Sequence, residues 1–363
     1  MKRLLHVLGS AGLGGSESLC LSLTRHMQSI GIDQEVLFLT EAGGPARERL
    51  AEWGIPTGSV AATTRGGLIS GVRNHVRRTK PDAVLSFMFG IHAFIGMGAR
   101  LGGVRSTLAF VGNPPPKDDR AKRRSSLLAA LGAPFTSHVV ACSEYVARRM
   151  RSGYGRLGGR ATVIHNWCEV DAIARRVDEI HRGERREPRS IGMIARLDPI
   201  KDHSSLLKAF AKIRSDRPHI ELRIVGEGPL APELRSLAAE LTVDDAVIFL
   251  GSTADPIAEL AGMDIFAFAT TDQEGFGLVL AEAMAAGVPI VATAVGPVPE
   301  VLAEGRGGLL CPSTETRDLA HGLMRMLDEP DLRREVSQAA RSLVRERYEV
   351  ASAAQRIISL IDA

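Results

Sequence analysis

The stretch Asp272–Pro289 reads DQEGFGLVLAEAMAAGVP and follows the apolar run Ile265–Ala269. A short apolar run, a glycine-containing loop and a helix-length segment, in this order, predict a strand, a loop and a helix that begins near Gly277. Gly275 and Gly277 would let the loop backbone approach a ligand closely. The start of the helix would direct free N–H groups and the positive end of the helix dipole toward that ligand, which suits a diphosphate.

Two glutamates belong to the same stretch. Glu274 precedes the helix, and Glu282 follows eight residues later, inside it. A carboxylate only accepts hydrogen bonds, so each glutamate is suited to hold pairs of hydroxyl groups, such as those of a sugar or a ribose. The alternative is an ordinary strand, loop and helix with one glutamate on the surface and one on a helix face. The combination of both glutamates with the two glycines favours a binding site.

The alternation of strand-length and helix-length segments extends along the chain in both directions. It predicts an α/β protein with two doubly wound domains, each a parallel sheet covered by helices. Ligands in such sheets bind beyond the carboxyl ends of the strands, so the cleft between two facing sheets is the expected site. Residues 170–189 interrupt the alternation, and their charge, centred on Arg182–Pro188, predicts a linker. The expected strands are 4–8, 34–39, 83–87, 107–111, 138–141, 190–195, 221–225, 246–250, 265–269 and 289–293, and the expected helices are 16–30, 46–53, 93–101, 204–215, 232–241, 255–261, 277–286, 318–327, 331–346 and 350–361.

Length and composition indicate an ordinary globular protein. The 363 residues suffice for about two domains, and 45% hydrophobic with 24% charged residues exclude a disordered chain, a collagen or a coiled coil. No run approaches the ~20 apolar residues of a membrane span. The first apolar run, Leu4–Leu8, is too short for a signal peptide, so we expect a cytoplasmic protein. The cysteines have no metal-ligand spacing and are expected to be buried thiols: Cys20, Cys142, Cys168 and Cys311.

Charge is unevenly distributed along the chain. Residues 1–168 contain 22 Lys and Arg against 10 Asp and Glu, whereas residues 169–363 contain 23 against 32. A basic half and an acidic half suggest a different partner for each. The basic segment 117–124 could be a lid, a surface that meets anionic lipid or an anionic acceptor, or a solvated helix face. Nucleic acid is not an expected partner, because no aromatic residues are interleaved with the basic ones.

Two further motifs follow expected strands of the second half. Arg196 and Lys201 flank a proline-containing turn directly after the strand at 190–195. Both cations can therefore reach the same crevice, where they would neutralise a diphosphate unless they are simply solvated. Gly226 and Gly228 form a glycine turn after the strand at 221–225, at the same sheet edge.

The first expected strand is also followed by a glycine-rich loop, which contains Gly14 and Gly15 and leads into a helix. Its spacing departs from GxGxxG, and no acidic residue ends the second strand where a nicotinamide dinucleotide requires one. A flexible loop that closes over a sugar fits this segment better.

These motifs, in this order, resemble the retaining GT-B glycosyltransferases of glycosyltransferase family 4, the glycosyl transferases group 1. The segment Gly14–Glu17 matches the glycine-rich acceptor-side loop of that family, and His165–Trp167 stands where relatives carry an Asn-Gly-Val stretch. The resemblance implies two Rossmann-like domains that face each other across a cleft. Residues 1–168 would form the acceptor-side domain, with a C-terminal helix of about 348–363 packed back on it, and residues 169–347 the donor-binding domain.

The resemblance also implies roles for single residues. Arg196 and Lys201 would bind the donor diphosphate and stabilise its charge as it leaves. Glu274 would hold hydroxyls of the donor sugar, and Glu282 would hold the nucleotide ribose. The remaining donor-site positions would be the turn glycines and the backbone N–H groups that cap the sugar and phosphate: Gly226, Gly228, Phe276, Gly277 and Leu278.

Many relatives carry a catalytic histidine after a strand of the first domain. The candidate here is His92, which follows the strand at 83–87 and precedes the helix at 93–101. It is either a catalytic residue or a packed, helix-capping one. Asn113, after the next strand, is a polar candidate or a turn residue.

We therefore predict a retaining hexosyltransferase that moves a sugar from a nucleotide-diphosphate sugar to a glycan, lipid-linked or small-molecule acceptor, in polysaccharide or glycolipid biosynthesis. Arg196, Lys201 and a helix N-terminus would stabilise the leaving diphosphate, so neither a metal nor another cofactor is expected. The alternatives are another enzyme of this kind, such as a UDP-sugar 2-epimerase or hydrolase, and a catalytically silent nucleotide-sugar-binding module. The basic first half adds the expectation of peripheral contact with the anionic inner face of a membrane.

Overall fold

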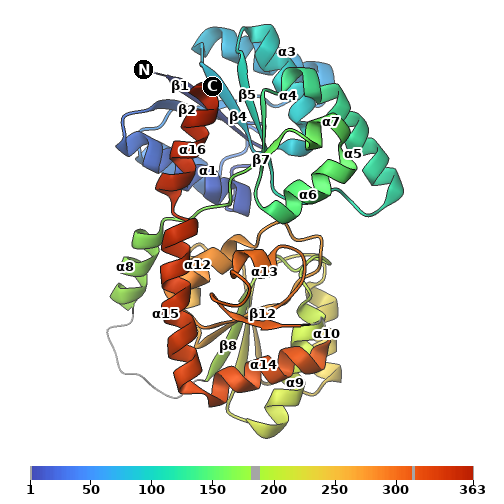
Figure 1. Ribbon diagram of the computed structural model, residues 1–363, viewed down its shortest axis with the longest axis vertical. Helices are drawn as coiled ribbons and strands as arrows, with labels where there is room; N and C mark the ends of the chain where they lie inside the picture. The colour runs from blue at the N-terminus through green and yellow to red at the C-terminus, as the bar shows by residue number, and fades with distance from the viewer. Residues whose placement is uncertain (1, 181–188, 313–314, 363) are drawn as a thin grey trace. The chain divides into compact units, whose positions relative to one another are not determined.

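The computed structural model describes residues 2–180, 189–312 and 315–362. The chain divides into two compact units, which Figure 1 shows in sequence colours. Unit 1 comprises Met1–Trp167 and Val350–Ala363, and unit 2 comprises Cys168–Glu349. Each unit contains one parallel sheet with helices packed against it.

Unit 1 is built on a seven-stranded sheet with the order β3-β2-β1-β4-β5-β6-β7. Its strand order reverses between β1 and β4, which is where ligands bind in doubly wound sheets. At this point Gly9, directly after β1, lies against Met88, directly after β4: a Cβ on Gly9 would lie 2.5 Å from the Met88 methyl carbon. The strands are β1 Arg3–Leu8, β2 Asp33–Phe38, β3 Thr57–Ser59, β4 Ala83–Ser86, β5 Ser106–Val111, β6 His138–Ala141 and β7 Ala161–Val163.

The helices of unit 1 include the last helix of the chain. α16 (Val350–Asp362) lies beside α1, and the Lys2 ammonium pairs with the Asp362 carboxylate (Figure 1). The other helices are α1 Gly15–Ser29, α2 Pro45–Glu52, α3 Arg65–Thr79, α4 His92–Gly102, α5 Asp119–Gly132, α6 Glu144–Gly153 and α7 Gly155–Gly158, with short 3-10 turns at Phe89–Ile91 and Ala133–Phe135.

Unit 2 repeats this topology with a six-stranded sheet of order β10-β9-β8-β11-β12-β13. The reversal of strand order falls between β8 and β11. The strands are β8 Ser190–Ile194, β9 Glu221–Val225, β10 Val247–Gly251, β11 Ile265–Phe268, β12 Ile290–Thr293 and β13 Leu309–Cys311. The helices are α8 Val170–Ile180, α9 His203–Asp216, α10 Ala231–Glu240, α11 Pro256–Ala261, α12 Leu278–Ala286, α13 Val298–Val301, α14 Thr316–Asp328 and α15 Pro330–Arg347.

The central strands of both sheets are apolar over almost their full length, because helices cover both faces of a parallel sheet. In unit 1 every residue of β4 is buried, and in unit 2 every residue of β11 is buried. The fold class expected from the sequence, two doubly wound Rossmann-like domains, is thereby confirmed. All four cysteines are buried, as expected.

One expectation is wrong. Residues 170–189 were expected to form a linker, but Val170–Ile180 forms α8. Val170, Ile173 and Val177 are buried on one face of this helix, which packs against α11 and α12. The charged residues between them lie on the exposed face, so the segment has the spacing of an amphipathic helix, and the overall charge of residues 170–189 caused it to be interpreted as a linker. Arg182–Pro188, the centre of the expected linker, lies outside the described residues. None of the described helices combines the length and apolar character that crossing a membrane requires.

Candidate functional site

The loops after β8 and β11 are joined by hydrogen bonds at the point where the strand order of unit 2 reverses. The N–H of Thr271 and the hydroxyl of Thr270 both donate to the carbonyl of Ile200, at 2.9 and 3.0 Å. The N–H of Asp202 donates to the carbonyl of Ala269 at 3.2 Å. These bonds hold the Arg196–Lys201 segment against the start of the Glu274 loop.

A mostly buried ion pair connects the two loops. The Lys201 ammonium contacts Oε2 of Glu274, and the side chains are only 18% and 9% exposed. The other carboxylate oxygen, Oε1, accepts the backbone N–H groups of Gly275 at 3.0 Å, Phe276 at 3.4 Å and Gly277 at 3.2 Å. Glu274 is therefore held by both loops and by the backbone that leads into α12.

The surroundings of Glu274 keep its carboxylate ionised. Burial alone disfavours the charged form, but the Lys201 ammonium and the N–H groups of Gly275 and Phe276 outweigh it, so the pKa of Glu274 is lowered below its ordinary value. The Lys201 ammonium also lies 5.0 Å from the centre of the Phe268 ring. The site thus presents one fixed cation and one fixed anion at the edge of the sheet.

Arg196 belongs to the same loop but is held differently. Its guanidinium bonds to Oδ2 of Asp198 at 2.7 and 2.5 Å, while Oδ1 of Asp198 accepts the N–H of Ile200 at 3.0 Å. Asp198 is buried, whereas the Arg196 side chain is 73% exposed. Sequence reasoning did not single out Asp198, although its place two residues after Arg196 is the signal that could have identified it.

The glycine turn after β9 packs against the backbone of this cationic loop. Gly226 has φ +137°, and a Cβ on Gly228 would lie 2.2 Å from the carbonyl oxygen of Leu197. The N–H of Leu197 donates to the carbonyl of Glu227 at 2.9 Å. The two glycines are required because the neighbouring backbone leaves no room for a side chain.

The loop before α12 has a local structural role in addition to any role in binding. Gly277 has φ +78° and precedes the first turn of α12, which begins at Leu278. The Phe276 ring is buried and contacts the Tyr348 ring edge-on, with 5.3 Å between the ring centres. The N–H groups of Phe276 and Gly277, expected to cap a sugar and a phosphate, donate here to Glu274.

Glu282 lies within α12 and is partly buried. Desolvation raises the pKa of its carboxyl to about 7. This group therefore titrates near neutral pH, unlike Glu274, whose pKa is lowered.

The remaining expected site residues lie in unit 1. Gly14 precedes α1 and Gly15 is its first residue. Beside them, the Ser10 hydroxyl donates to Oε1 of the buried Glu17 at 2.6 Å. Sequence reasoning did not select this pair, because a serine and a glutamate near a helix start are common in capping.

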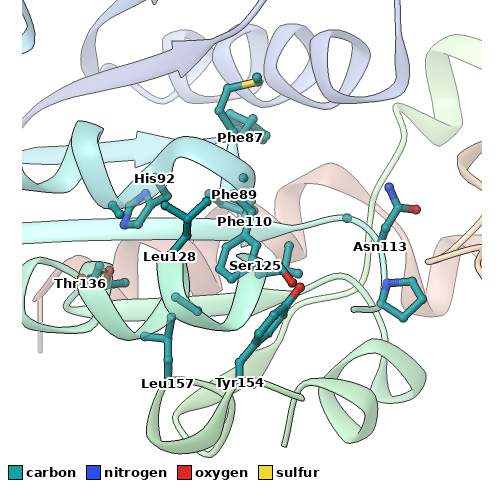
Figure 2. Close-up of a pocket in the computed structure, with 18 of the residues that line it drawn as sticks. Phe87, Phe89, His92, Phe110, Asn113, Ser125, Leu128, Thr136, Tyr154 and Leu157 are labelled. Carbon is teal, nitrogen blue, oxygen red and sulfur yellow. Dashed lines mark hydrogen bonds between the residues drawn. The ribbon is translucent and has the colours of Figure 1, made fainter. Parts of the chain in front are cut away.

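His92 is the first residue of α4 and lines a cavity within unit 1 (Figure 2). It is 2% exposed, and neither of its ring nitrogens has a hydrogen-bond partner in the part of the chain that the structure describes. Burial lowers the pKa of His92 to about 4, so its imidazole is neutral at neutral pH. Within the described ranges, no three His, Cys, Asp or Glu side chains gather in a group that could hold a metal ion.

Two family models match the chain. The model for glycosyl transferases group 1 matches residues 175–343, and the model for the glycosyl transferase 4-like domain matches residues 14–167. The chain therefore belongs to the group 1 glycosyl transferases of glycosyltransferase family 4, as its motifs indicate.

Part of the chain is similar in sequence to curated relatives. N-acetyl-alpha-D-glucosaminyl L-malate synthase of Bacillus anthracis is 36% identical over 155 residues, which are 43% of this chain and 40% of that protein. A GDP-mannose-dependent monoacylated alpha-(1-6)-phosphatidylinositol monomannoside mannosyltransferase of Corynebacterium glutamicum is 30% identical over 238 residues, 61% of each chain. The matched region spans less than two thirds of the length of either relative.

The fold is also similar to that of solved structures. HepE of Anabaena, in a crystal structure with UDP-glucose, superposes with a TM-score of 0.84 over 100% of both chains, at 20% sequence identity. At this identity the similarity establishes a shared fold, and this fold is the GT-B architecture that the sequence led us to expect.

Proposed function

We propose that this protein is a retaining glycosyltransferase that uses a nucleotide-diphosphate sugar, with the donor bound at the carboxyl edge of the sheet in unit 2. The observation that carries the proposal is the Lys201–Glu274 pair at the reversal of strand order, with Arg196 on the same loop. A cation suited to a diphosphate and an anion suited to sugar hydroxyls lie side by side there.

The chemistry follows from the charge that develops as the donor reacts. The bond between the anomeric carbon and the diphosphate breaks, and Lys201 and Arg196 stabilise the charge on the departing diphosphate. An oriented cation in a water-poor site contributes about 2–4 kcal/mol to such a transition state. Lys201 is mostly buried and pairs with Glu274, whereas the exposed Arg196 can reach out to the phosphates.

Glu274 orients the donor sugar, and Glu282 holds the ribose of the nucleotide. Glu274 is ionised and held by backbone N–H groups, so it accepts hydrogen bonds from sugar hydroxyls without a change of protonation. Oε2 exchanges its Lys201 partner for a sugar hydroxyl when the diphosphate binds Lys201. The first N–H groups of α12 approach the sugar and phosphate.

Retention follows from attack on the same face from which the diphosphate departs. The acceptor oxygen forms the new bond to the anomeric carbon, and its proton passes to the departing diphosphate. Charge stabilisation by side chains and a helix N-terminus makes a metal ion unnecessary in this scheme. Gly14, Gly15 and His92 of unit 1 serve the acceptor side.

The acceptor is proposed to be a lipid-linked or glycan hydroxyl. The mannosyltransferase relative is named for a phosphatidylinositol-based acceptor, and HepE binds UDP-glucose, which makes UDP a candidate nucleotide here. The exposed side chains of Arg123, Arg124, Leu127 and Leu131 on α5 combine positive charge with apolar surface, which suits peripheral contact with an anionic membrane.

The test is a panel of UDP, GDP and ADP sugars measured by thermal unfolding, followed by product analysis with the donor that binds. A donor specific for the folded state raises the melting temperature. Release of free sugar or an epimerised product without an acceptor would identify a hydrolase or a 2-epimerase instead. Donor binding without turnover on any acceptor would identify a silent binding module. If no nucleotide raises the melting temperature, the proposed donor site is wrong.

A further inference from the structure

His203 is a buried histidine directly behind the cationic loop of the proposed donor site. It is the first residue of α9, two positions after Lys201, and it is 1% exposed. The side chain of Asp202, which precedes it, caps the helix by accepting the N–H of Ser205 at 3.1 Å. The start of α9 therefore does not need the imidazole as a cap.

The imidazole of His203 contacts the main chain of Lys201. Its Nδ1 lies 3.0 Å from the Lys201 carbonyl oxygen, which also accepts the backbone N–H of His203 at 2.9 Å. Because a carbonyl oxygen only accepts hydrogen bonds, Nδ1 carries the hydrogen and donates it. The other ring nitrogen, Nε2, is buried and has no partner among the residues that the structure describes.

His203 is neutral at neutral pH. Burial is the largest influence on its pKa and lowers it below the ordinary value, and the nearby Lys201 ammonium lowers it further. The hydrogen bond to the Lys201 carbonyl acts in the opposite direction, as do the carboxylates of Asp198 and Asp202, but these do not reverse the shift. A neutral imidazole adds no second positive charge beside Lys201, so it acts on that residue through the Nδ1 bond.

An apolar side chain would suit the core better than His203 does. A buried acceptor without a partner costs free energy, and a leucine at this position would avoid that cost while the backbone N–H still bonds the Lys201 carbonyl. A residue that breaks a local rule in this way is typical of a functional site. The other buried side chains of α9 are all apolar: Leu206, Leu207, Ala209, Phe210 and Ile213.

The peptide groups around Lys201 are hydrogen-bonded within unit 2. The Lys201 N–H donates to the carbonyl of Asp198 at 3.0 Å, and the Asp202 N–H donates to the carbonyl of Ala269 at 3.2 Å. The Nδ1 bond adds a side-chain hold on the Lys201 carbonyl, next to the Cα that carries the ammonium paired with Glu274. A catalytic charge depends strongly on such placement, because a small displacement slows the reaction.

We propose that His203 is a positioning residue for Lys201: through Nδ1, its imidazole holds the Lys201 carbonyl so that the ammonium is presented to the donor diphosphate. The inference rests on the proposed function, because Lys201 is the cation assigned to that diphosphate. His203 acts through Lys201 and is not itself a catalytic residue.

The first experiment compares His203→Leu with His203→Asn. The two new side chains branch alike at Cγ, but only asparagine carries an N–H near the position of Nδ1. His203→Leu should weaken UDP binding about fivefold, the effect of one hydrogen bond, and should leave UMP binding nearly unchanged because UMP lacks the second phosphate. His203→Asn should retain most of the UDP affinity. Calorimetry measures both ligands, and an asparagine variant as weak as the leucine variant would overturn the proposal.

Stability distinguishes positioning from a role in the core. His203→Leu should keep or raise the urea midpoint of the unmodified protein, because the unpartnered acceptor is gone. Phe210→Leu, at a buried position of the same helix, should lower the midpoint but leave the ratio of UDP to UMP affinities unchanged. If His203→Leu loses stability together with equal affinity for both nucleotides, His203 is a core residue and the proposal is wrong.

The tautomer of His203 can be tested without any loss of folding. In the unmodified protein with isotope-labelled histidine, nuclear magnetic resonance should show a hydrogen on Nδ1 and none on Nε2. The His203 signals are assigned by their absence in His203→Asn. The opposite tautomer would overturn the proposal even if His203→Leu fails to fold.

The titration of Glu274 separates this inference from the proposed function, because it needs no nucleotide. The Lys201 ammonium helps to lower the pKa of Glu274, so this pKa should rise in His203→Leu and stay low in His203→Asn, as measured by carboxyl chemical shifts. An unchanged pKa of Glu274 in His203→Leu would refute the positioning role alone. A protein that shows the shift but binds no UDP, GDP or ADP would refute the proposed donor site alone.

Discussion

Lys201 and Arg196 are two cations on one loop, but their environments give them different energetic roles. Lys201 pairs with Glu274 in a largely buried setting, and the Arg196–Asp198 pair leaves the guanidinium mostly in solvent. Breaking a buried pair leaves an unpaired charge away from water, whereas an exposed pair contributes little to stability. Measuring both the stability and the activity of variants can therefore distinguish the role of Lys201 from that of Arg196.

Lys201→Ala and Arg196→Ala should each slow sugar transfer by about 30- to 1000-fold, equivalent to ~2–4 kcal/mol. Their effects on folding should differ. Lys201→Ala should lower the free energy of unfolding by about 3 kcal/mol, and Arg196→Ala by less than about 1 kcal/mol. Urea unfolding and steady-state kinetics on the same preparations provide both measurements.

The control for Lys201 is the double variant Lys201→Met with Glu274→Gln. It removes both charges while retaining similar side-chain volumes, so it should recover most of the stability lost in Lys201→Ala but none of the activity. Recovery of transfer in the double variant would show that the pair is structural. Near-normal turnover in both alanine variants would exclude the two cations from catalysis.

Glu282 should make both stability and donor binding depend on pH near neutrality. Its raised pKa of about 7 means that the folded state holds the proton more tightly than the unfolded state. The associated stability is fully present below the ordinary carboxyl pKa of about 4.5 and is lost as the pH rises toward 7. Glu282→Gln should therefore gain stability relative to the unmodified protein over this interval, as measured by urea unfolding at a series of pH values.

Binding of the donor should change in the opposite direction. The ionised carboxylate accepts two ribose hydroxyls, so affinity for UDP-glucose should rise as the pH increases through about 7. Glu282→Gln should bind more weakly and without this rise. A Glu282→Gln protein with the same pH profile as its parent would show that Glu282 does not contact the ribose.

The sequence predicted single site residues best where a strand end and a glycine turn fix the backbone. It placed Lys201 and Glu274 at one sheet edge, and the structure brings their side chains into contact. It did not anticipate that Glu274 would engage the N–H groups of Phe276 and Gly277, because side-chain to backbone bonds depend on loop geometry. Asp198 was missed although it stands two residues after Arg196, with which it pairs.

At the scale of elements, the expected strands and helices of unit 2 between 190 and 293 occur within about two residues of their expected bounds. Short elements such as β3 and β13 were missed because three residues carry too little pattern. α3 was missed although it has 15 residues, because its glycines lower its intrinsic helix propensity. Tertiary packing overrides that propensity: a Cβ on Gly98 of α4 would lie 2.8 Å from the carbonyl of Ile69 in α3.

Gly228→Ala should disturb the turn after β9 and, through it, the cationic loop. The added Cβ would lie 2.2 Å from the carbonyl oxygen of Leu197, so the two backbones must separate. We expect a loss of about 1–3 kcal/mol in the free energy of unfolding and weaker UDP binding, because Arg196 is displaced together with Leu197. Calorimetry with UDP and urea unfolding measure the two effects.

Gly262→Ala is the matched control in the same unit. Gly262 follows α11 with an ordinary negative φ of −78°, and an added Cβ would lie no closer than 3.5 Å to its neighbours. This variant should change stability by less than about 0.5 kcal/mol and leave UDP binding intact. Equal behaviour of the two variants would mean that the turn does not position the cationic loop.

At the scale of the whole molecule, the sequence predicted two doubly wound domains from alternation alone, because parallel sheets require a helix between successive strands. The difference in net charge between the two halves of the chain is also a property of the whole molecule. Residues 1–168 carry an excess of positive charge and residues 169–363 an excess of negative charge. A partner with an anionic surface should therefore bind the first half of the chain in preference to the second.

Binding to vesicles tests this expectation. The full chain should co-sediment with vesicles of phosphatidylglycerol and phosphatidylcholine at 50 mM salt and dissociate at 500 mM salt, because screening shortens the reach of surface charges. Arg123→Glu with Arg124→Glu should reduce binding at least tenfold. Both arginines are exposed on α5, which also carries the exposed Leu127 and Leu131.

The matched control changes net charge equally in unit 2. Lys208 and Lys212 are exposed on α9, four residues apart, so Lys208→Glu with Lys212→Glu alters the total charge by the same amount at another place. If the position of the altered charges determines vesicle binding, this variant keeps nearly all of its binding, because its charges lie in the acidic half of the chain. Equal losses in the two variants would mean that only net charge matters and that α5 is not the contact surface. Binding that is insensitive to salt would exclude an electrostatic contact altogether.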